Sequence, residues 1–231
     1  MHVSTHNAKH LKIAQVIEHR FGGRPKRMLV VGCGSGSEAA TLGKELGAHV
    51  IGIDLKDNFD FEAAAQVELR VADATALPFE DECFDFVYSY HALEHIPDFR
   101  QALREMRRVL SRSGGWYIGT PNRSRFAGYI GNDEVPLRDK LRWNLIDWKM
   151  RAKGRFKNEY GAHAGFTEAE LRSELVPILG PAHCISIDYY LAIYPGHQSM
   201  INFIGTTGLG RWVFPSVYFM STQRRDDSGT L

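Results

Sequence analysis

Apolar residues along this chain follow two alternating patterns, short continuous runs and helical spacing. The runs are rich in Val, Ile, Phe and Tyr and are bounded by glycine or polar residues, as buried strands are. They predict strands at 28–32, 49–54, 67–73, 84–90 and 116–121, with two more near 183–191 and 216–223. Between them, helical spacing predicts helices at 8–21, 37–46, 98–110 and 167–179.

Alternation of strands and helices predicts an α/β fold with right-handed crossovers and a mainly parallel sheet covered on both faces. We expect a doubly wound sheet of seven strands in a single domain over residues 1–231, with a leading helix within residues 1–24. A turn is expected at Ser113–Gly115, between a helix and a strand. Thr167 and Glu170 have the spacing of a capping box, which marks a helix start. Residues 224–231 should be a frayed tail.

Residues 123–160 interrupt the alternation with a basic, strandless segment. Residues 123–157 carry 10 Lys/Arg against 4 Asp/Glu, so this segment has a different charge from its surroundings. Within it, four large apolar side chains recur on one helical face: Leu137, Leu141, Leu145 and Trp148. We interpret it as a helical, lid-like insertion. A membrane-surface helix, a nucleic-acid surface and a helix packed on the domain are the alternatives.

Composition fits a globular protein. The chain has 231 residues, 44% of them hydrophobic and 24% charged, with a net charge of +1. The first ten residues lack the apolar core of a signal peptide, and polar residues interrupt the apolar stretch 201–220, so a soluble protein is expected. Three cysteines without a CxxC pair favour a reducing, cytoplasmic compartment.

The segment VVGCGSG places three glycines between a predicted strand and a predicted helix. Glycines there allow a ligand to approach the backbone and the free N–H groups of the helix start. Asp54 ends the next strand 22 residues after Gly32, where a carboxylate can accept hydrogen bonds from ribose hydroxyls. Together these features favour a nucleoside cofactor. A nicotinamide cofactor is disfavoured because Ser37 stands where the dinucleotide motif has its third glycine.

With these motifs the chain resembles the class I S-adenosylmethionine-dependent methyltransferases, most closely the small-molecule branch typified by ubiquinone-biosynthesis enzymes. The resemblance covers about residues 28–122 and rests on GCGSG (32–36), IGID (51–54), VADATALPFEDECFDFVYSYHALEHI (71–96) and REMRRVLSRSGGWYIGTPN (104–122). It implies the Rossmann-like methyltransferase fold, S-adenosyl-L-methionine as cofactor, and a small-molecule or lipid-linked acceptor methylated at oxygen.

The resemblance also implies residue roles. The cofactor-binding residues expected from it are Gly32, Cys33, Gly34, Gly36, Asp54, Leu55, Asp73, Ala74 and Tyr90. His91 and His163 are the candidates for catalysis, since a histidine could deprotonate a hydroxyl acceptor.

Two features keep other readings open. The family usually has an aspartate where Val30 stands, which leaves a non-catalytic nucleoside-binding module as the rival function, with an RNA-directed enzyme behind it. The run His91–His95 spells H-x-x-E-H, an inverted zinc-peptidase motif. Since Pro97 and the preceding strand indicate a turn rather than a long helix, no metal site is predicted, and His95 is expected to pack that turn.

Overall fold

The computed structural model describes residues 5–129, 135–160 and 162–221. Its strands are β1 (Arg27–Val31), β2 (His49–Asp54), β3 (Glu68–Val71), β4 (Phe84–Tyr90), β5 (Leu110–Pro121), β6 (Ala182–Cys184) and β7 (Ser216–Ser221). Its α-helices are α1 (Thr5–Phe21), α2 (Ser37–Leu46), α3 (Phe61–Ala64), α4 (Phe99–Val109), α5 (Leu137–Ala152), α6 (Glu168–Leu179), α7 (Ser186–Ile193), α8 (Gln198–Thr206) and α9 (Gly210–Val213). The predicted tail at 224–231 lies outside the described residues.

All seven strands form one sheet in the order β3-β2-β1-β4-β5-β7-β6. β1 to β5 pair in parallel, while β7 runs antiparallel to both β5 and β6. The predicted α/β class and the mainly parallel, seven-stranded sheet are therefore confirmed. The order reverses between β1 and β4, the place where open α/β sheets bind ligands beyond the strand ends.

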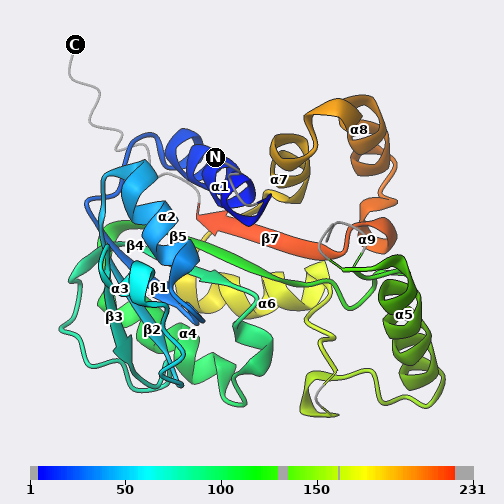
Figure 1. Cartoon of the computed structure of the whole chain (residues 1–231), viewed down its shortest axis with the longest axis horizontal. Coiled ribbons are helices and arrows are strands. Elements are labelled where there is room, and N and C mark those ends of the chain that lie inside the picture. Colours follow the sequence, from blue (N-terminus) through cyan, green and yellow to red (C-terminus); the bar gives the residue numbers. More distant parts are fainter. Residues whose placement is uncertain (1–4, 130–134, 161, 222–231) are drawn as a thin grey trace.

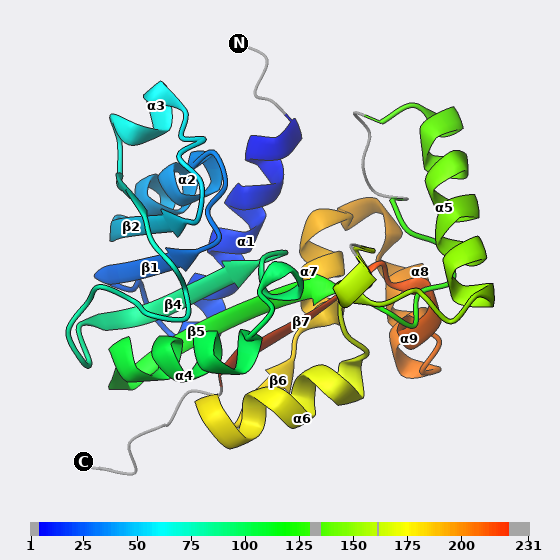
Figure 2. The same ribbon diagram turned by 90° about the horizontal axis from the view of Figure 1, so that it is seen from below.

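Helices cover both faces of the sheet (Figures 1 and 2). Alternate residues of each buried strand point to opposite faces, so β1 sends Leu29 and Val31 to one core and Met28 and Val30 to the other. The first core is closed by α4 and α6, the second by α1, α2 and α7. Burial of apolar surface on both faces is the main stabilising contribution to this arrangement.

The segment predicted as a strand near 183–191 is mostly helical. β6 ends at Cys184 and α7 begins at Ser186. Ile185 N–H still donates to Tyr218 of β7 at 2.9 Å, and after it the chain turns into the helix. Tyr189 and Tyr190 then pack against Tyr218, with Tyr189 stacked on it at a centroid distance of 3.8 Å. Packing of these rings on β7 favours the helix over an edge strand.

The turn predicted at Ser113–Gly115 falls within β5, which begins at Leu110, but the strand is irregular there. Phe84 of β4 pairs with Leu110 and Phe86 pairs with Gly115, so the register shifts across the predicted turn. A Cβ on Gly115 would lie 2.7 Å from the ring of Phe21 in α1, and one on Gly114 would lie 2.6 Å from Leu110. The glycines therefore mark an irregular part of the strand and also allow close packing there.

Segment 123–160 contains α5, which stands beyond the carboxyl ends of β4 and β5 (Figure 2). Arg125 ties it to the sheet: its guanidinium is buried and pairs with Asp147 of α5 at 3.2 Å. The same group donates to the carbonyls of Asn122 at 3.1 Å and His163 at 3.0 Å. None of the helices in the described parts of the chain is long and apolar enough to cross a membrane.

Candidate functional site

The glycine turn after β1 is anchored to β2 through its backbone. Gly32 and Cys33 both donate from N–H to the carbonyl of Ile53 at 2.9 Å. A Cβ on Gly32 would lie 2.2 Å from Ala92, and one on Gly36 would lie 2.5 Å from Leu69, so these two glycines are required by packing. Gly34 differs: its φ is +54°, and no atom lies within 4 Å of where its Cβ would be. The turn therefore leaves open space beside Gly34, where a ligand could approach the backbone.

Asp54, at the end of β2, faces this turn. Its Oδ2 accepts from Gly34 N–H at 2.9 Å, and its Oδ1 accepts from Lys56 N–H at 3.2 Å. A carboxylate has about four acceptor sites, so capacity remains for the hydroxyls of a ribose. Leu55 follows with 64% of its surface exposed. Asp54 thus holds the glycine turn in place and also offers acceptor capacity beside it.

Asp73 and Ala74 follow β3, one strand further along the sheet. The Oδ1 of Asp73 accepts from both the N–H and the hydroxyl of Thr75 at 2.8 Å. These hydrogen bonds lower the pKa of Asp73, so the exposed carboxylate is ionised at neutral pH. Ala74 is buried against the core under α4. The place predicted to bind adenine therefore has a small side chain, Ala74, next to the exposed carboxylate of Asp73, which Thr75 holds in a fixed orientation.

Cys33 is placed differently from the other turn residues. It is 7% exposed and belongs to the core under α1 and α2. Burial raises the pKa of its thiol, so the sulfur stays neutral. Its backbone N–H donates to the carbonyl of Ile53, and its carbonyl accepts from the N–H of Gly36. Both main-chain groups of Cys33 are therefore already used in hydrogen bonds that stabilise the turn.

These residues fit a nucleoside cofactor. β3, β2, β1 and β4 are neighbours in the sheet, so their carboxyl ends meet at one edge. That edge carries the open space at Gly34, the acceptor capacity of Asp54 and the exposed Asp73.

Tyr90 ends β4, and a residue of α1 binds its hydroxyl. Lys9 donates to the Tyr90 hydroxyl, which also lies 3.3 Å from the hydroxyl of Tyr189. Burial lowers the pKa of Lys9. The ring of Tyr90 stacks on that of His91 at a centroid distance of 4.4 Å. α1 therefore closes over the end of β4, a role for Lys9 that sequence reasoning missed.

His91 has a strained backbone and a partly buried ring. Its φ is +52°, unusual for a side chain with a Cβ, and its N–H donates to Gly119 at 2.8 Å. Its Nε2 lies 3.0 Å from the hydroxyl of Ser216 on β7. Burial, helped by the positive charges of Lys9 and Arg125, lowers the pKa of His91 to about 3. The ring is therefore neutral at physiological pH, and strain of this kind is often found at functional sites.

Glu38, in the first turn of α2, is partly buried beside α1. The hydroxyl of Tyr88 donates to its Oε1 at 2.5 Å, and Nε2 of His10 lies 3.5 Å from the same oxygen. Burial raises the pKa of Glu38 to about 7. The only sequence signal for this residue was its place just after the glycine turn.

The H-x-x-E-H run does not form a metal-peptidase helix. Leu93–His95 is a single turn of 3₁₀ helix, and His91 directly follows the end of β4. His95 is also not the packing residue that we expected, because 53% of its side chain is exposed. Its ring instead lies edge to face with that of His163, at a centroid distance of 4.8 Å.

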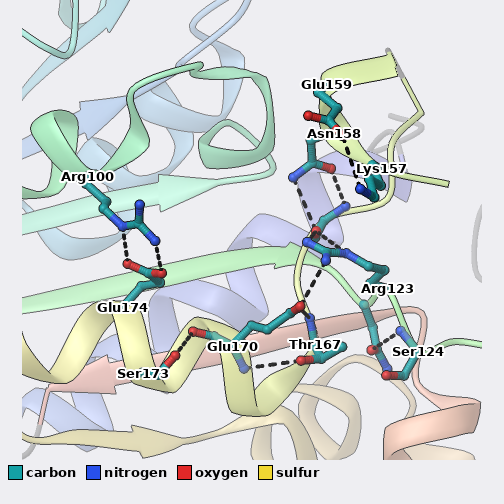
Figure 3. Close-up of polar contacts among 12 residues, drawn as sticks. Arg100, Arg123, Ser124, Lys157, Asn158, Glu159, Thr167, Glu170, Ser173 and Glu174 are labelled. Carbon is teal, nitrogen blue, oxygen red and sulfur yellow. Dashed lines mark hydrogen bonds and ion pairs between the residues drawn. The ribbon is translucent and has the colours of Figure 1, made fainter. Parts of the chain in front are cut away.

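His163 reaches this place because its loop is fixed to the end of β5. Phe166 N–H donates to the carbonyl of Pro121 at 3.0 Å, and a Cβ on Gly165 would collide with that carbonyl. Asn158 holds Gly165 from the other side, accepting from its N–H at 2.8 Å. Figure 3 shows this loop with Arg123, which donates to the Gly165 carbonyl at 2.8 Å and bonds Glu170.

Residues 29–118 match the family model described as a methyltransferase domain. Tocopherol O-methyltransferase of Arabidopsis thaliana is 35% identical over 119 residues, which are 48% of this chain and 34% of that protein. Demethylmenaquinone methyltransferase of Staphylococcus aureus is 38% identical over 96 residues, 38% of this chain and 40% of that protein. The match thus spans less than half of each relative.

Among solved structures, the plantazolicin methyltransferase BpumL in complex with SAH superposes with a TM-score of 0.62. The two are 16% identical, and the alignment covers 94% of this chain and 83% of that one. This similarity shows that nearly the whole chain shares the fold, including β6 and β7 beyond the matched domain.

Proposed function

Since residues 29–118 form a class I, S-adenosylmethionine-dependent methyltransferase domain, we propose that this chain moves a methyl group from S-adenosylmethionine to a small-molecule acceptor. The observation that carries the proposal is the open space at Gly34 beside Asp54, at the edge where the strand order reverses. The cofactor supplies an activated methyl group on sulfur. The chain contributes binding, orientation and exclusion of water.

We assign the cofactor to the edge formed by β1, β2, β3 and β4. Gly34 lets it approach the turn, while Gly32, Gly36 and Cys33 keep the turn in shape through packing. Asp54 and Leu55 border the ribose side, and Asp73 with Ala74 borders the adenine. Tyr90 marks the side of the site nearest the methyl group.

The acceptor belongs on the far side of Tyr90, where His91 and His163 lie. A histidine whose pKa is about 3 is a weak base, so His91 orients the acceptor through hydrogen bonding rather than by taking its proton. We propose oxygen as the methylated atom, which is supported by similarity to an enzyme named as an O-methyltransferase. Segment 123–160 would cover this side, since α5 stands beyond the ends of β4 and β5 (Figure 2).

A lipid-linked acceptor is favoured by the outward face of α5. This helix buries Asn144 and Asp147 and exposes its large apolar side chains to solvent. The exposed ones are Leu137 at 71%, Leu141 at 58%, Leu145 at 53% and Ile146 at 45%. Arg138, Arg142 and Lys149 border the same face. An apolar stripe flanked by cations is typical of helices that lie on an anionic lipid surface.

Transfer of labelled methyl from S-adenosylmethionine to a panel of phenol, quinol and alcohol acceptors tests the activity. The parent should turn over at least one acceptor class, and Asp54→Ala should bind the cofactor at least tenfold more weakly, since a charge-assisted hydrogen bond contributes about 1.5–3 kcal/mol. Cofactor binding by calorimetry without turnover on any acceptor would instead support a non-catalytic binding module.

Cosedimentation with vesicles tests the membrane contact. We expect binding to anionic vesicles that weakens as salt rises, and loss of that binding in the double variant Leu141→Gln, Leu145→Gln. Val176→Gln changes an exposed apolar residue of α6 and is the matched control. Equal sedimentation of parent and double variant would exclude α5 as the lipid contact.

A further inference from the structure

Glu94, His95 and His163 form a cluster that the proposed cofactor binding does not use. One donor atom from each lies within 4.8 Å of one from each of the others. The Nε2 of His95 is 3.8 Å from Oε1 of Glu94, and the two histidine rings meet edge to face. The residues come from the 3₁₀ turn after β4 and from the loop before α6, which Gly165 and Phe166 hold against the end of β5.

The carboxylate of Glu94 is the second, independent observation. Its side chain is 1% exposed, and neither of its oxygens has a hydrogen-bond partner among the described residues. A buried carboxylate without a partner is costly, and such groups in folded proteins are normally paired or coordinate metals. The buried guanidinium of Arg125 is already committed to Asp147 and to backbone carbonyls.

The donor set indicates the kind of ligand. Two imidazoles and one carboxylate are the ligands of borderline divalent metals, as in zinc sites of the His₂Glu type, whereas Mg²⁺ and Ca²⁺ prefer oxygen alone. Tetrahedral ligands about 2.0–2.1 Å from zinc are about 3.3 Å apart. The separation between Glu94 and His95 is near that value. His163 is exposed, so its ring can rotate to close the remaining gap.

We propose that Glu94, His95 and His163 bind a divalent first-row transition metal such as Zn²⁺, with a fourth position left open. Glu94 follows His91 by three positions, in the turn after β4. The next step rests on the proposed function: the open position would take the acceptor oxygen. A metal bound by these residues would lower the pKa of that hydroxyl and so help it lose its proton to solvent before methyl transfer.

The metal-binding step can be tested without cofactor or acceptor. The full chain is made without a histidine tag and is stripped of metal by a chelator. Calorimetry then follows titration with Zn²⁺. In a second titration with Co²⁺, the visible absorption of a four- or five-coordinate site is measured. We expect one metal per chain with a dissociation constant below about 10 µM, which corresponds to a binding free energy of at least about 7 kcal/mol. His163→Ala should weaken binding at least tenfold and remove the Co²⁺ absorption.

Two further variants make the result specific. Glu94→Gln keeps the shape of the buried side chain and should also weaken binding at least tenfold. His183→Ala removes an exposed histidine on β6 and should bind as the parent does. Equal affinity in the parent, Glu94→Gln and His163→Ala would show surface histidine binding only and overturn the site. Normal metal binding together with absent methyl transfer would instead retain the site and reject the proposed function.

Discussion

Gly34→Ala separates the ligand role of the glycine turn from its structural role. The φ of Gly34 is +54°, so alanine there adopts a left-handed conformation that costs about 1–2 kcal/mol, partly offset by about 0.4–1 kcal/mol from a less flexible unfolded chain. No atom lies within 4 Å of the new Cβ, so no clash is added. The net loss should be about 1 kcal/mol, a fall of about 2–4 °C in Tm for a chain of this size.

Gly47→Ala provides the matched control. Gly47 caps the end of α2 with φ +63°, and it too has no atom within 4 Å of a Cβ. Both variants should therefore lose similar stability. Only Gly34→Ala should bind S-adenosylmethionine more weakly, by at least tenfold or about 1.4 kcal/mol, because its methyl group would fill space next to the ligand.

Calorimetric titration of both variants and thermal unfolding without ligand give the two quantities needed. Equal cofactor affinity in Gly34→Ala and Gly47→Ala would refute the placement of the cofactor beside Gly34. A much larger stability loss in Gly34→Ala would show that the space is filled by protein and that the turn is purely structural.

Two other variants probe the buried titratable groups near the site. The pKa of Glu38 is raised to about 7 in the folded state, so its ionisation destabilises the fold increasingly between pH 4.5 and 7. Over this pH range the free energy of unfolding of Glu38→Gln, measured with denaturant, should rise above that of the parent by up to about 3 kcal/mol. A difference independent of pH would contradict the burial argument. His91→Asn places another residue that tolerates positive φ at this position. It should lower turnover more than cofactor affinity, and the pH profile of turnover near 6.5 should not shift. Unchanged turnover at saturating acceptor would show that His91 is not part of the site.

Most of the sheet could be predicted because the signals for it are local. β1, β2 and β4 are continuous apolar runs, and the glycine turn and Asp54 lie at their ends. The prediction of a strand at 183–191 was wrong because Ile185, Ile187 and Tyr189 alternate with polar residues, as apolar residues do in a strand. The helix there exists because tyrosines pack on β7, a contact with residues about 30 positions later in the chain. Packing between distant parts of the chain can therefore override the secondary structure that the local sequence pattern favours.

The acceptor side of the site depends on contacts between distant segments, so the sequence could predict it only in part. Lys9 meets Tyr90, 81 positions away, and nothing around Lys9 distinguishes it from other lysines of an amphipathic helix. The sequence singles out His95 and His163 individually, but it does not predict that they lie together. They come together because the loop before α6 is bound to the end of β5 through Phe166 and Gly165. That pairing has no local signature.

α5 shows what an amphipathic pattern leaves undetermined. The spacing of Leu137, Leu141 and Leu145 predicts a helix with one apolar face, but it does not say whether that face meets the protein or its surroundings. The buried ion pair of Asp147 with Arg125 turns the opposite, polar face inward. An isolated buried pair contributes little net stability, so the arrangement is better explained as fixing the orientation of the helix. The leucines remain exposed as a consequence, and this exposure is the observation behind our proposal that α5 contacts a lipid surface.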